Sequence, residues 1–348
     1  MTSRDYRRIL VTGGAGFIGS CYVRDVLARG DGTRITVLDK LTYAGNRSNL
    51  ADVEADPGRS ARFTFVQGDI ADADVVGPLV ADADAVVNFA AESHVDRSIL
   101  DPEAFIRTGV VGVHVLLEAV RAASAGRSEP VRFLQVSTDE VYGSVEQGHS
   151  VETDRLEPRS PYSAVKAAGE LLVSSYVATH GVDAVVTRGA NTYGPYHHPE
   201  KLIPLFLTNA LDDQPLPLYG DGLQRRDYIH IDDAVAALLR MAESPASVGR
   251  IYNVGSGVGT PLVDMAHAIR SAAGSGRIEH VPWPAIAAEI ETGDFVADLT
   301  RIREELGWQP AVPLAEGLAR TISHYKAQLA GAPEAASYGT AADSVRES

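Results

Sequence analysis

Tyr162 and Lys166 lie four residues apart in the segment SPYSAVKAAGE, where the spacing of apolar residues predicts a helix over 163–180. Residues four apart share one face of a helix, so the ammonium group would lie beside the phenol. A nearby positive charge favours the phenolate of a tyrosine that otherwise titrates near a pKa of about 10. Such a tyrosine can act as a base toward an alcohol hydroxyl. A half-buried tyrosine beside a solvated lysine is the ordinary interpretation of this spacing when no other signal accompanies it.

A second set of reactive side chains follows the predicted strand in VRFLQVSTDEVYG. Ser137, Thr138, Asp139 and Glu140 stand at its carboxyl end, where ligands bind in parallel sheets. Two adjacent carboxyl groups push one pKa upward, so that one group can hold a proton while its neighbour acts as a base. A solvated turn is the alternative interpretation, but the position at a strand end favours acid–base chemistry.

A glycine-rich loop, ILVTGGAGFIGS, places Gly13, Gly14, Gly16 and Gly19 between a predicted strand and a predicted helix. Glycines permit a tight turn, and the N-terminus of the helix offers N–H groups to a pyrophosphate. Asp39 ends the next predicted strand, 20 residues after Gly19. A carboxylate there accepts hydrogen bonds from ribose hydroxyls and repels a 2′-phosphate, which favours NAD over NADP. The neighbouring Lys40 keeps the NADP alternative open.

These side chains require a framework of alternating strands and helices. Six apolar runs have β-rich composition, namely RRILVTGG, TRITVLDK, ARFTFVQGD, ADAVVNFAA, VRFLQVST and VDAVVTRG. Segments with helical spacing lie between them, at 18–27, 110–123 and 163–180. This order predicts an α/β fold with a Rossmann-type, doubly wound parallel sheet and a smaller C-terminal α/β domain.

The amino-acid composition changes after about residue 190. The segments NTYGPYHHPEKLIP and QPLPLYGDG are rich in Pro and Tyr and are interpreted as loops and turns. We expect an NAD-binding domain over 1–190 and a substrate domain over 191–330. The first domain would have an interleaved return near 230–255, because 232–244 has helical spacing and IYNVGSG resembles a strand. The small, polar tail 331–348 is predicted to be disordered.

The composition excludes several other classes of protein. Lys and Arg total 31 against 46 Asp and Glu, and the resulting formal charge of −15 argues against a nucleic-acid partner. Cys21 is the single cysteine, so an internal disulfide or a cysteine-built zinc site is excluded, no metal is expected, and a cytoplasmic location is the default. No apolar run approaches about 18 residues, so no membrane association is expected.

Taken together, the motifs resemble the extended short-chain dehydrogenase/reductases, and among these the dTDP-glucose 4,6-dehydratases. The segments that carry the resemblance are TGGAGFIGS, LDKLTYAGNRSNL, FAAESHVDRS, STDEVYGS, SPYSAVKA, NTYGPYHHPEKLIPLF and YGDGLQRRDYIH. The similarity is close over 7–240 and looser over 250–325. The TDE triplet with YxxxK and PEKLIP is far more specific than the glycine loop.

This resemblance implies an NAD-dependent dehydration of a nucleoside diphosphate glucose, most simply dTDP-glucose, to the 4-keto-6-deoxy sugar. Tyr162 would deprotonate the 4-hydroxyl with help from Thr138 and Lys166, while hydride passes from C4 to NAD. Glu140 would then remove the C5 proton and Asp139 would protonate the departing C6 hydroxyl. The hydride would finally return to C6.

The resemblance also implies two sets of contact residues. Besides Tyr162 and Lys166, the cofactor would contact Gly13, Gly16, Phe17, Ile18, Gly19, Asp39, Lys40, Leu41, Thr42, Asp69, Ile70, Ala90, Ala91, Glu92, Ser93 and Thr108. The nucleotide sugar would contact His94, Thr138, Asn191, Lys201, Leu202, Pro217, Leu218, Tyr219 and Arg226. Arg226 is the natural partner of the pyrophosphate. For His94, a structural histidine is a nearly equal alternative.

Three departures from the family pattern concern the nucleotide end of the substrate. Thr192 and Val258 stand where the family usually has asparagine, and EIETGDFVADLT replaces a stretch that usually contains Arg and His. These departures leave the nucleobase open, because a lost arginine removes a charge-assisted contact to a diphosphate.

Two other functions are alternatives to the dehydratase, and the resemblance also implies an oligomeric state. The segment EIETGDFVADLT resembles epimerases and decarboxylases, so a UDP-sugar 4-epimerase or UDP-glucuronate decarboxylase is one alternative, against which the Asp139–Glu140 pair counts. An NAD-binding scaffold protein is the other. By resemblance, a homodimer is expected through helices near 103–123 and 162–180.

Overall fold

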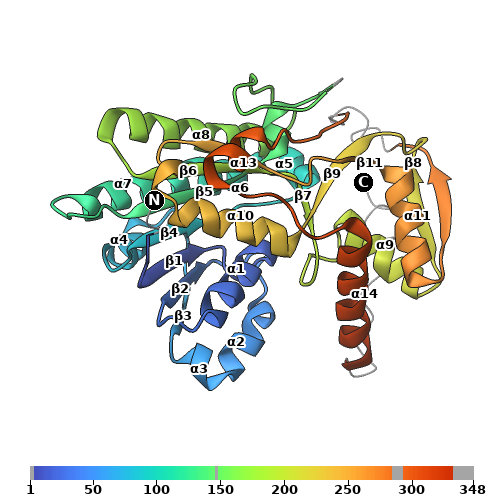
Figure 1. The fold of residues 1–348 in the computed structure, drawn as a ribbon, viewed down its shortest axis with the longest axis horizontal. Helices are drawn as coiled ribbons and strands as arrows, with labels where there is room; N and C mark the ends of the chain where they lie inside the picture. The colour runs from blue at the N-terminus through green and yellow to red at the C-terminus, as the bar shows by residue number, and fades with distance from the viewer. Residues whose placement is uncertain (1–3, 146–147, 284–292, 332–348) are drawn as a thin grey trace.

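The computed structural model describes residues 4–145, 148–283 and 293–331, and its centre is a seven-stranded parallel sheet (Figure 1). The strand order is β10-β6-β5-β4-β1-β2-β3. The strands are β1 (Arg8–Thr12), β2 (Arg34–Asp39), β3 (Phe63–Gln67), β4 (Ala85–Asn88), β5 (Arg132–Thr138), β6 (Ala184–Gly189) and β10 (Ile251–Val254). Every neighbouring pair is parallel, so all seven carboxyl ends lie at one edge. The predicted doubly wound α/β sheet is confirmed.

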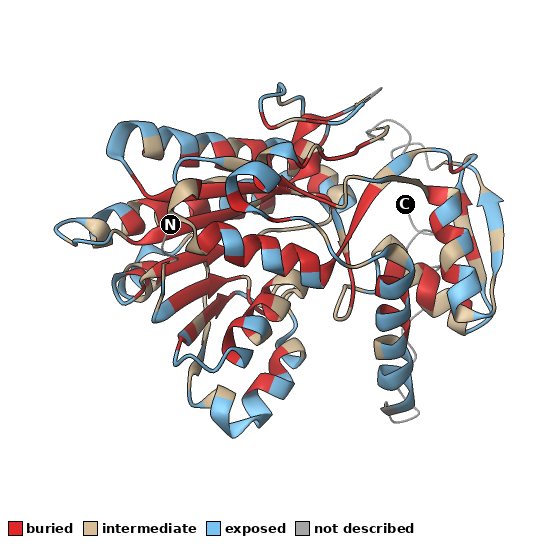
Figure 2. Cartoon of the chain, in the orientation of Figure 1, coloured by how far each residue is buried: buried red, intermediate tan, exposed pale blue. Residues whose placement is uncertain are grey.

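Helices cover both faces of this sheet, as Figure 1 shows. One core cluster joins the sheet to α1 (Phe17–Ala28), α10 (Ile231–Glu243) and α13 (Thr300–Leu306), and the other joins it to α4 (Ala73–Ala81), α7 (Val113–Ser124) and α8 (Pro161–His180). Apart from the edge strand β3, whose residues are intermediate or exposed, the strands of this sheet are mostly buried, while the outer faces of the helices are exposed (Figure 2). This two-sided burial explains why the strands are continuously apolar rather than alternating.

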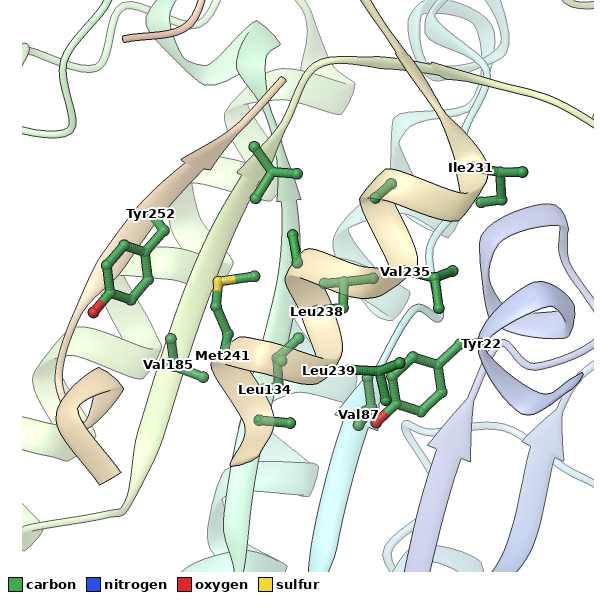
Figure 3. Packing of buried hydrophobic residues seen from close by; sticks show 14 of the residues in the cluster. Tyr22, Val87, Leu134, Val185, Ile231, Val235, Leu238, Leu239, Met241 and Tyr252 are labelled. Carbon is green, nitrogen blue, oxygen red and sulfur yellow. The ribbon is translucent and has the colours of Figure 1, made fainter. Parts of the chain in front are cut away.

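Helix α10 returns to the sheet after the chain has left it. Leu239 of α10 packs beside Tyr22 of α1 and Val87 of β4, and Leu238 belongs to the same core cluster (Figure 3). Each fully buried leucine contributes about 1.5–3 kcal/mol. Strand β10 then adds to the sheet edge by pairing with β6, with Ile251 opposite Val186.

The remaining elements are shorter or lie apart from the large sheet. Near it are α2 (Ala51–Ala55), α3 (Pro57–Ser60), α5 (Val95–Leu100) and α6 (Pro102–Ile106). Two small sheets, β11-β9-β7 and β12-β8, contain β7 (Asn191–Tyr193), β8 (Pro215–Tyr219), β9 (Arg225–His230), β11 (Gly259–Pro261) and β12 (Arg277–Val281). A third core cluster joins them to α9 (Leu202–Leu211), α11 (Leu262–Ala273) and α14 (Leu314–Gly331). Within the described ranges, no helix is long and apolar enough to cross a membrane.

The interpretation of QPLPLYGDG and NTYGPYHHPEKLIP as loops alone is wrong. The first segment contains β8 and the second contains β7 and the start of α9. Among the described residues, strand β8 pairs with β12 alone and so lies at a sheet edge. The missing N–H groups of Pro215 and Pro217 are tolerated on such an edge. The segment 289–292 and the predicted tail 332–348 lie outside the described residues.

Candidate active site

The turn that follows β5 carries Thr138, Asp139 and Glu140 at the carboxyl edge of the sheet. Thr138 precedes a 3-10 turn, Asp139–Tyr142, and its hydroxyl accepts a hydrogen bond from the Glu140 N–H at 3.3 Å. The same hydroxyl donates to Oδ1 of Asp139 at 2.9 Å. Asn191 of β7 donates from Nδ2 to the other oxygen, Oδ2, at 3.4 Å. The turn therefore fixes the Asp139 carboxyl group between β5 and β7.

The Asp139 carboxyl group is suited to hold a proton. Its side chain is buried, and burial raises its pKa to about 6, while the Thr138 hydrogen bond and the positive charge of Arg226 act in the opposite direction. The neighbouring carboxylate of Asp227 raises the pKa further. An acid with this pKa is partly protonated near neutral pH, which is what a general acid requires.

Helix α8 brings Tyr162 and Lys166 to the same edge. The helix begins with a capping box in which the side chains of Ser160 and Ser163 each accept a hydrogen bond from the other's backbone N–H, and Pro161 occupies the first turn. Tyr162 and Lys166 thus lie one helical turn apart, directly after a well-defined helix start. Nζ of the buried Lys166 donates to the backbone oxygen of Val136 in β5 at 2.6 Å.

The titration of this pair differs from the expectation based on sequence. Burial raises the pKa of Tyr162, and the charge of Glu140 raises it further, although a hydrogen bond to Thr138 lowers it. Burial also lowers the pKa of Lys166 to about 8. With these surroundings Tyr162 is a protonated phenol near neutral pH. A further positive charge must lie near its hydroxyl before it can act as a base.

The glycine loop forms a cradle for a dinucleotide. Gly13 has φ +69°, and a Cβ atom there would lie 2.6 Å from the Ala90 backbone nitrogen. A Cβ on Gly19 would lie 2.4 Å from the Gly13 oxygen, so the loop and α1 approach as closely as glycine allows. Helix α1 begins at Phe17 without a side-chain cap, so its first N–H groups are available at the loop. These residues fit the pyrophosphate of NAD.

Asp39 lies at the carboxyl end of β2, beside this loop. Its Oδ2 accepts a hydrogen bond from the Ala15 N–H at 2.9 Å, and its Oδ1 accepts one from the Leu41 N–H at 2.8 Å. Burial raises the pKa of Asp39, although these two hydrogen bonds lower it. Each carboxylate oxygen retains a further lone pair, so the residue can still accept from a ribose hydroxyl.

The other predicted cofactor residues surround the same end of the sheet. Lys40 pairs with Asp69 at 2.9 Å, so its charge is already balanced by a carboxylate. Thr42 donates to Glu92 at 3.4 Å. Ala90, Ala91 and Ser93 follow β4, whereas Ile70 and Thr108 are buried, Ile70 in the core cluster beneath α7. Tyr43 was not predicted: its hydroxyl accepts from the N–H groups of Ser93 and His94 at 2.7 and 2.9 Å and so orders this loop.

Lys201 and His94, both predicted to face the sugar, lie at the segment that follows β4. Nζ of Lys201 donates to the Ser93 oxygen at 2.9 Å, and burial lowers the Lys201 pKa, with the charge of Glu140 acting in the opposite direction. Nε2 of His94 lies 2.9 Å from Oε2 of Glu200. Ligand atoms of His94, His198 and Glu200 lie within 4.8 Å of one another, a spacing that a metal ion could bridge.

Two cations already act on this histidine group. Arg97 lies 3.4 Å from both carboxylate oxygens of Glu200. Burial lowers the pKa of His94 to about 4, and the charge of Lys201 lowers it further. The carboxylate therefore has a cationic partner, and the surrounding charge disfavours a divalent ion.

Strand β9 and its neighbours form the predicted nucleotide end. Arg226 donates from Nη1 to the backbone oxygen of Gly293. Asp227, which was not predicted, accepts from the N–H groups of Ser256, Gly257 and Ala297 at 2.7, 3.0 and 3.1 Å and thereby joins three segments. No motif signals this role, because it depends on contacts distant in sequence.

The remaining predicted contacts are divided between the surface and the core. Tyr219 is 38% exposed, and its ring centroid lies 5.4 Å from that of Trp283. The side chain of Leu218 points into the third core cluster, so only its backbone could meet a ligand. Val258 is 62% exposed. Pro217 lies on β8 beside these residues, and Leu202 begins α9.

Comparisons with known proteins agree with this geometry. A model of the GDP-mannose 4,6 dehydratase family matches residues 10–321. The dTDP-glucose 4,6-dehydratase of Streptomyces niveus is 46% identical over 328 residues, which cover 92% of this chain and 93% of that protein. The low-salt glycan biosynthesis protein Agl12 of Haloferax volcanii is 44% identical, covering 91% of this chain and 98% of that protein.

Solved structures show the same relationship. DesIV, a dTDP-glucose 4,6-dehydratase from Streptomyces venezuelae with NAD bound, superimposes with a TM-score of 0.85 at 43% identity, covering 93% of this chain and 98% of that one. A UDP-glucose 4-epimerase from Thermotoga maritima reaches a TM-score of 0.81 at 28% identity, with coverages of 92% and 99%. The chain therefore belongs to the extended short-chain dehydrogenase/reductases, within the family of the nucleotide-sugar 4,6-dehydratases.

Proposed function

We propose that this chain is a hydro-lyase that uses NAD to convert dTDP-glucose to the 4-keto-6-deoxy sugar. The observation that carries the proposal is the turn after β5, which holds a buried carboxyl group with a pKa of about 6 beside a second carboxyl group and within reach of Tyr162. An elimination across C5–C6 needs both an acid and a base, and a simple 4-epimerisation needs neither carboxyl group. Relatives 46% identical, named as dTDP-glucose 4,6-dehydratases, support the same activity.

In the first step, Tyr162 accepts the proton of the sugar 4-hydroxyl. Thr138 positions this hydroxyl, and Lys166 supplies a positive charge. A bound NAD would supply the hydride-transfer chemistry between C4 and C6 and a positive charge that favours the phenolate of Tyr162. The ketone at C4 acidifies the C5 proton. Glu140 removes this proton, while Asp139 protonates the C6 hydroxyl as it leaves as water. Glu140 then returns a proton to C5. The proton that Tyr162 took from the 4-hydroxyl is released and Asp139 takes one up, so the protein is restored and the net change is the loss of one water molecule.

The residues that would hold the cofactor are those of the cradle and its surroundings. The loop Gly13–Gly19 would face the pyrophosphate and Asp39 the adenosine ribose. Lys40 is engaged by Asp69, which supports NAD rather than NADP, because a 2′-phosphate would have to compete for that lysine. Among the other predicted contacts, Thr108 lies in the segment Arg107–Gly112, which contacts α8.

The nucleotide end of the substrate is the part of the site that differs from the family pattern. Arg225 donates to Asp294 from its backbone nitrogen at 2.7 Å and from Nε at 2.8 Å, so this arginine is occupied. Arg226 donates to the backbone oxygen of Gly293, and we assign Arg226, as the resemblance implies, to the diphosphate. Val258 and Tyr219 would form an apolar edge for the base.

Incubation of the NAD-loaded protein with single nucleotide sugars tests the proposal. The substrates are dTDP-glucose, UDP-glucose, UDP-glucuronate and UDP-N-acetylglucosamine, and the products are analysed by mass spectrometry. Loss of one water from dTDP-glucose is expected. A change of sugar without loss of mass would instead support an epimerase, loss of carbon dioxide a decarboxylase, and no turnover an NAD-binding scaffold protein.

The domain division and the oligomeric state belong to the same proposal. We propose an NAD domain over 1–190 with a return near 230–255, and a substrate domain over 191–330; the pairing of β10 with β6 supports this division. We also propose a cytoplasmic homodimer. Three exposed apolar side chains, Ile106, Val111 and Leu171, lie on α6, the turn Arg107–Gly112 and α8, which contact one another. A monomeric mass in solution scattering would contradict the dimer.

A further inference from the structure

A buried ion pair lies one helical turn beyond Lys166. Glu170 is 1% exposed and Arg188 is 3% exposed. Both Nε and Nη2 of Arg188, on β6, lie 2.9 Å from Oε2 of Glu170, on α8. The other oxygen of Glu170, Oε1, is buried without a hydrogen-bond partner among the described residues. A buried carboxylate with an unsatisfied oxygen is costly, and this calls for a reason beyond packing.

The position of Glu170 supplies that reason. Tyr162, Lys166 and Glu170 are spaced by four residues along α8, so their side chains lie on one face, and neighbours on this face have Cβ atoms about 5–6 Å apart. Lys166 itself is buried and directs Nζ to the Val136 oxygen. A buried ammonium group favours its neutral form unless a negative charge lies nearby.

The Arg188 guanidinium also contacts the turn that carries the two catalytic carboxyl groups. It lies over the ring of Tyr142, with 4.8 Å between Cζ and the ring centroid, and Nη1 donates to the Glu152 backbone oxygen at 3.2 Å. Tyr142 is the last residue of the turn that carries Asp139 and Glu140. One buried cation thus supports both the helix of Lys166 and the turn of the two carboxyl groups.

We propose that Glu170, held in place by Arg188, is a positioning residue that keeps Lys166 charged beneath Tyr162. This inference rests on the proposed function, in which Lys166 assists Tyr162 at the sugar C4. Without the Glu170 charge, Lys166 and Arg188 would be two buried cations with no anion between them.

Other charged groups near Lys166 do not replace Glu170. The groups on the packed elements are Tyr162 on α8, Asp139 and Glu140 on the turn after β5, Arg188 on β6, the exposed Asp96, Arg97, Glu103 and Arg107 on α5 to the turn before α7, and His114 and Glu118 on α7. His114 and Glu118 contact Tyr176, further along α8. Glu170, in contrast to these groups, raises the Lys166 pKa.

The test measures C4 oxidation separately from elimination. In an Asp139→Asn background, elimination is slow, so rapid mixing of the NAD-loaded protein with dTDP-glucose should build up reduced nicotinamide, whose absorbance is followed as a function of pH. The basic limb of the pH profile, where this rate falls as the pH rises, should reflect the loss of the Lys166 proton. Adding Glu170→Gln should move the limb to lower pH by about one unit or more, because a unit charge at this spacing exerts an effect of that size.

Three further variants separate positioning from folding. Glu152→Gln removes another buried carboxylate of the same network, which pairs with Arg301 at 3.6 Å, and should lower the melting temperature without moving the limb. Glu170→Leu combined with Arg188→Met removes both charges and avoids an unpaired arginine. It should move the limb in the same direction as Glu170→Gln but by less, because the positive charge of Arg188 is also gone. Glu170→Asp keeps the charge and should restore most of the original profile.

The outcomes are distinct. An unchanged limb in both the single and the double Glu170 variants would overturn this inference while leaving the proposed function intact. An equal shift in Glu152→Gln would also overturn it, because the effect would then be structural. Absence of reduced nicotinamide in the Asp139→Asn parent, together with absence of dehydration by the unmodified chain, would overturn the proposed function and this inference with it.

Discussion

Replacement of Asp139 by asparagine should slow dehydration and also stabilise the protein above about pH 6. An asparagine side chain has nearly the same shape and keeps an oxygen for the Thr138 hydroxyl, which now donates at 2.9 Å. It cannot supply a proton to the departing C6 hydroxyl. Since general acid catalysis contributes about 10²–10⁴-fold, we expect the dehydration rate to fall by that factor.

The effect on stability follows from the pKa of Asp139. Its pKa rises from 3.8 in the unfolded chain to about 6 in the folded protein. Because the folded-state value is the higher one, stability is lost as the pH rises through this window, and the loss is complete above about pH 6. A difference of about two pKa units corresponds to ~3 kcal/mol at pH 7 and above, and to roughly half of that at pH 5.

Asparagine removes this ionisation cost but introduces an amide that faces the Nδ2 group of Asn191, 3.4 Å from the present carboxylate oxygen. One of the two amides must therefore turn, which offsets part of the gain. We expect the variant to be more stable than the original by about 1–3 kcal/mol at pH 8, and by clearly less at pH 5.

Urea unfolding of both proteins at pH 5 and pH 8, without cofactor, measures this difference. Thr138→Val is the matched control, because it removes the hydrogen bond that supports the Asp139 carboxylate. It should destabilise the protein, and more at pH 8 than at pH 5. The reasoning is refuted if the stability difference between Asp139→Asn and the original chain does not change with pH.

Three further substitutions test other parts of the account. Gly13→Ala places a Cβ 2.6 Å from the Ala90 nitrogen at φ +69°, so it should cost about 1–3 kcal/mol in unfolding and weaken NAD binding in calorimetric titration; unchanged affinity would contradict the cradle. Asp39→Ala should weaken NAD binding at least ~10-fold, from the loss of a ribose acceptor, and a variant that still binds NAD as tightly would exclude this role. Asp227→Asn should cost about 1–3 kcal/mol in unfolding and raise KM for the nucleotide sugar, because an amide group would face backbone N–H groups; an unaltered KM would separate this residue from the nucleotide end.

The large sheet could be predicted from the sequence because its physical cause is local. Each strand is a short apolar run, and each intervening helix has apolar residues at helical spacing, so period and order together imply parallel strands covered on both faces. The glycine loop and Asp39 could be placed for the same reason, since they stand at strand ends. The small sheet containing β8 was not predicted, because two prolines in five residues are usually evidence against a strand.

The less predictable features depend on contacts between distant segments. The roles of Tyr43 and Asp227 come from hydrogen bonds to backbone groups about 29 to 70 residues away, which no motif encodes. The titration of Tyr162 also could not be predicted, because burial and the charge of Glu140 raise its pKa. The pair of Glu170 and Arg188 has the same character: the spacing along α8 is visible in the sequence, but the partner on β6 is not.

The central claim is that one site oxidises C4, eliminates water across C5–C6 and returns the same hydride to C6. Dehydration of dTDP-glucose carrying deuterium at C4, followed by mass spectrometry of the product, tests it most directly. We expect a product that has lost one water and carries the deuterium at C6. Recovery of an epimerised sugar without water loss, or of a dehydrated sugar whose deuterium has exchanged with solvent, would contradict it.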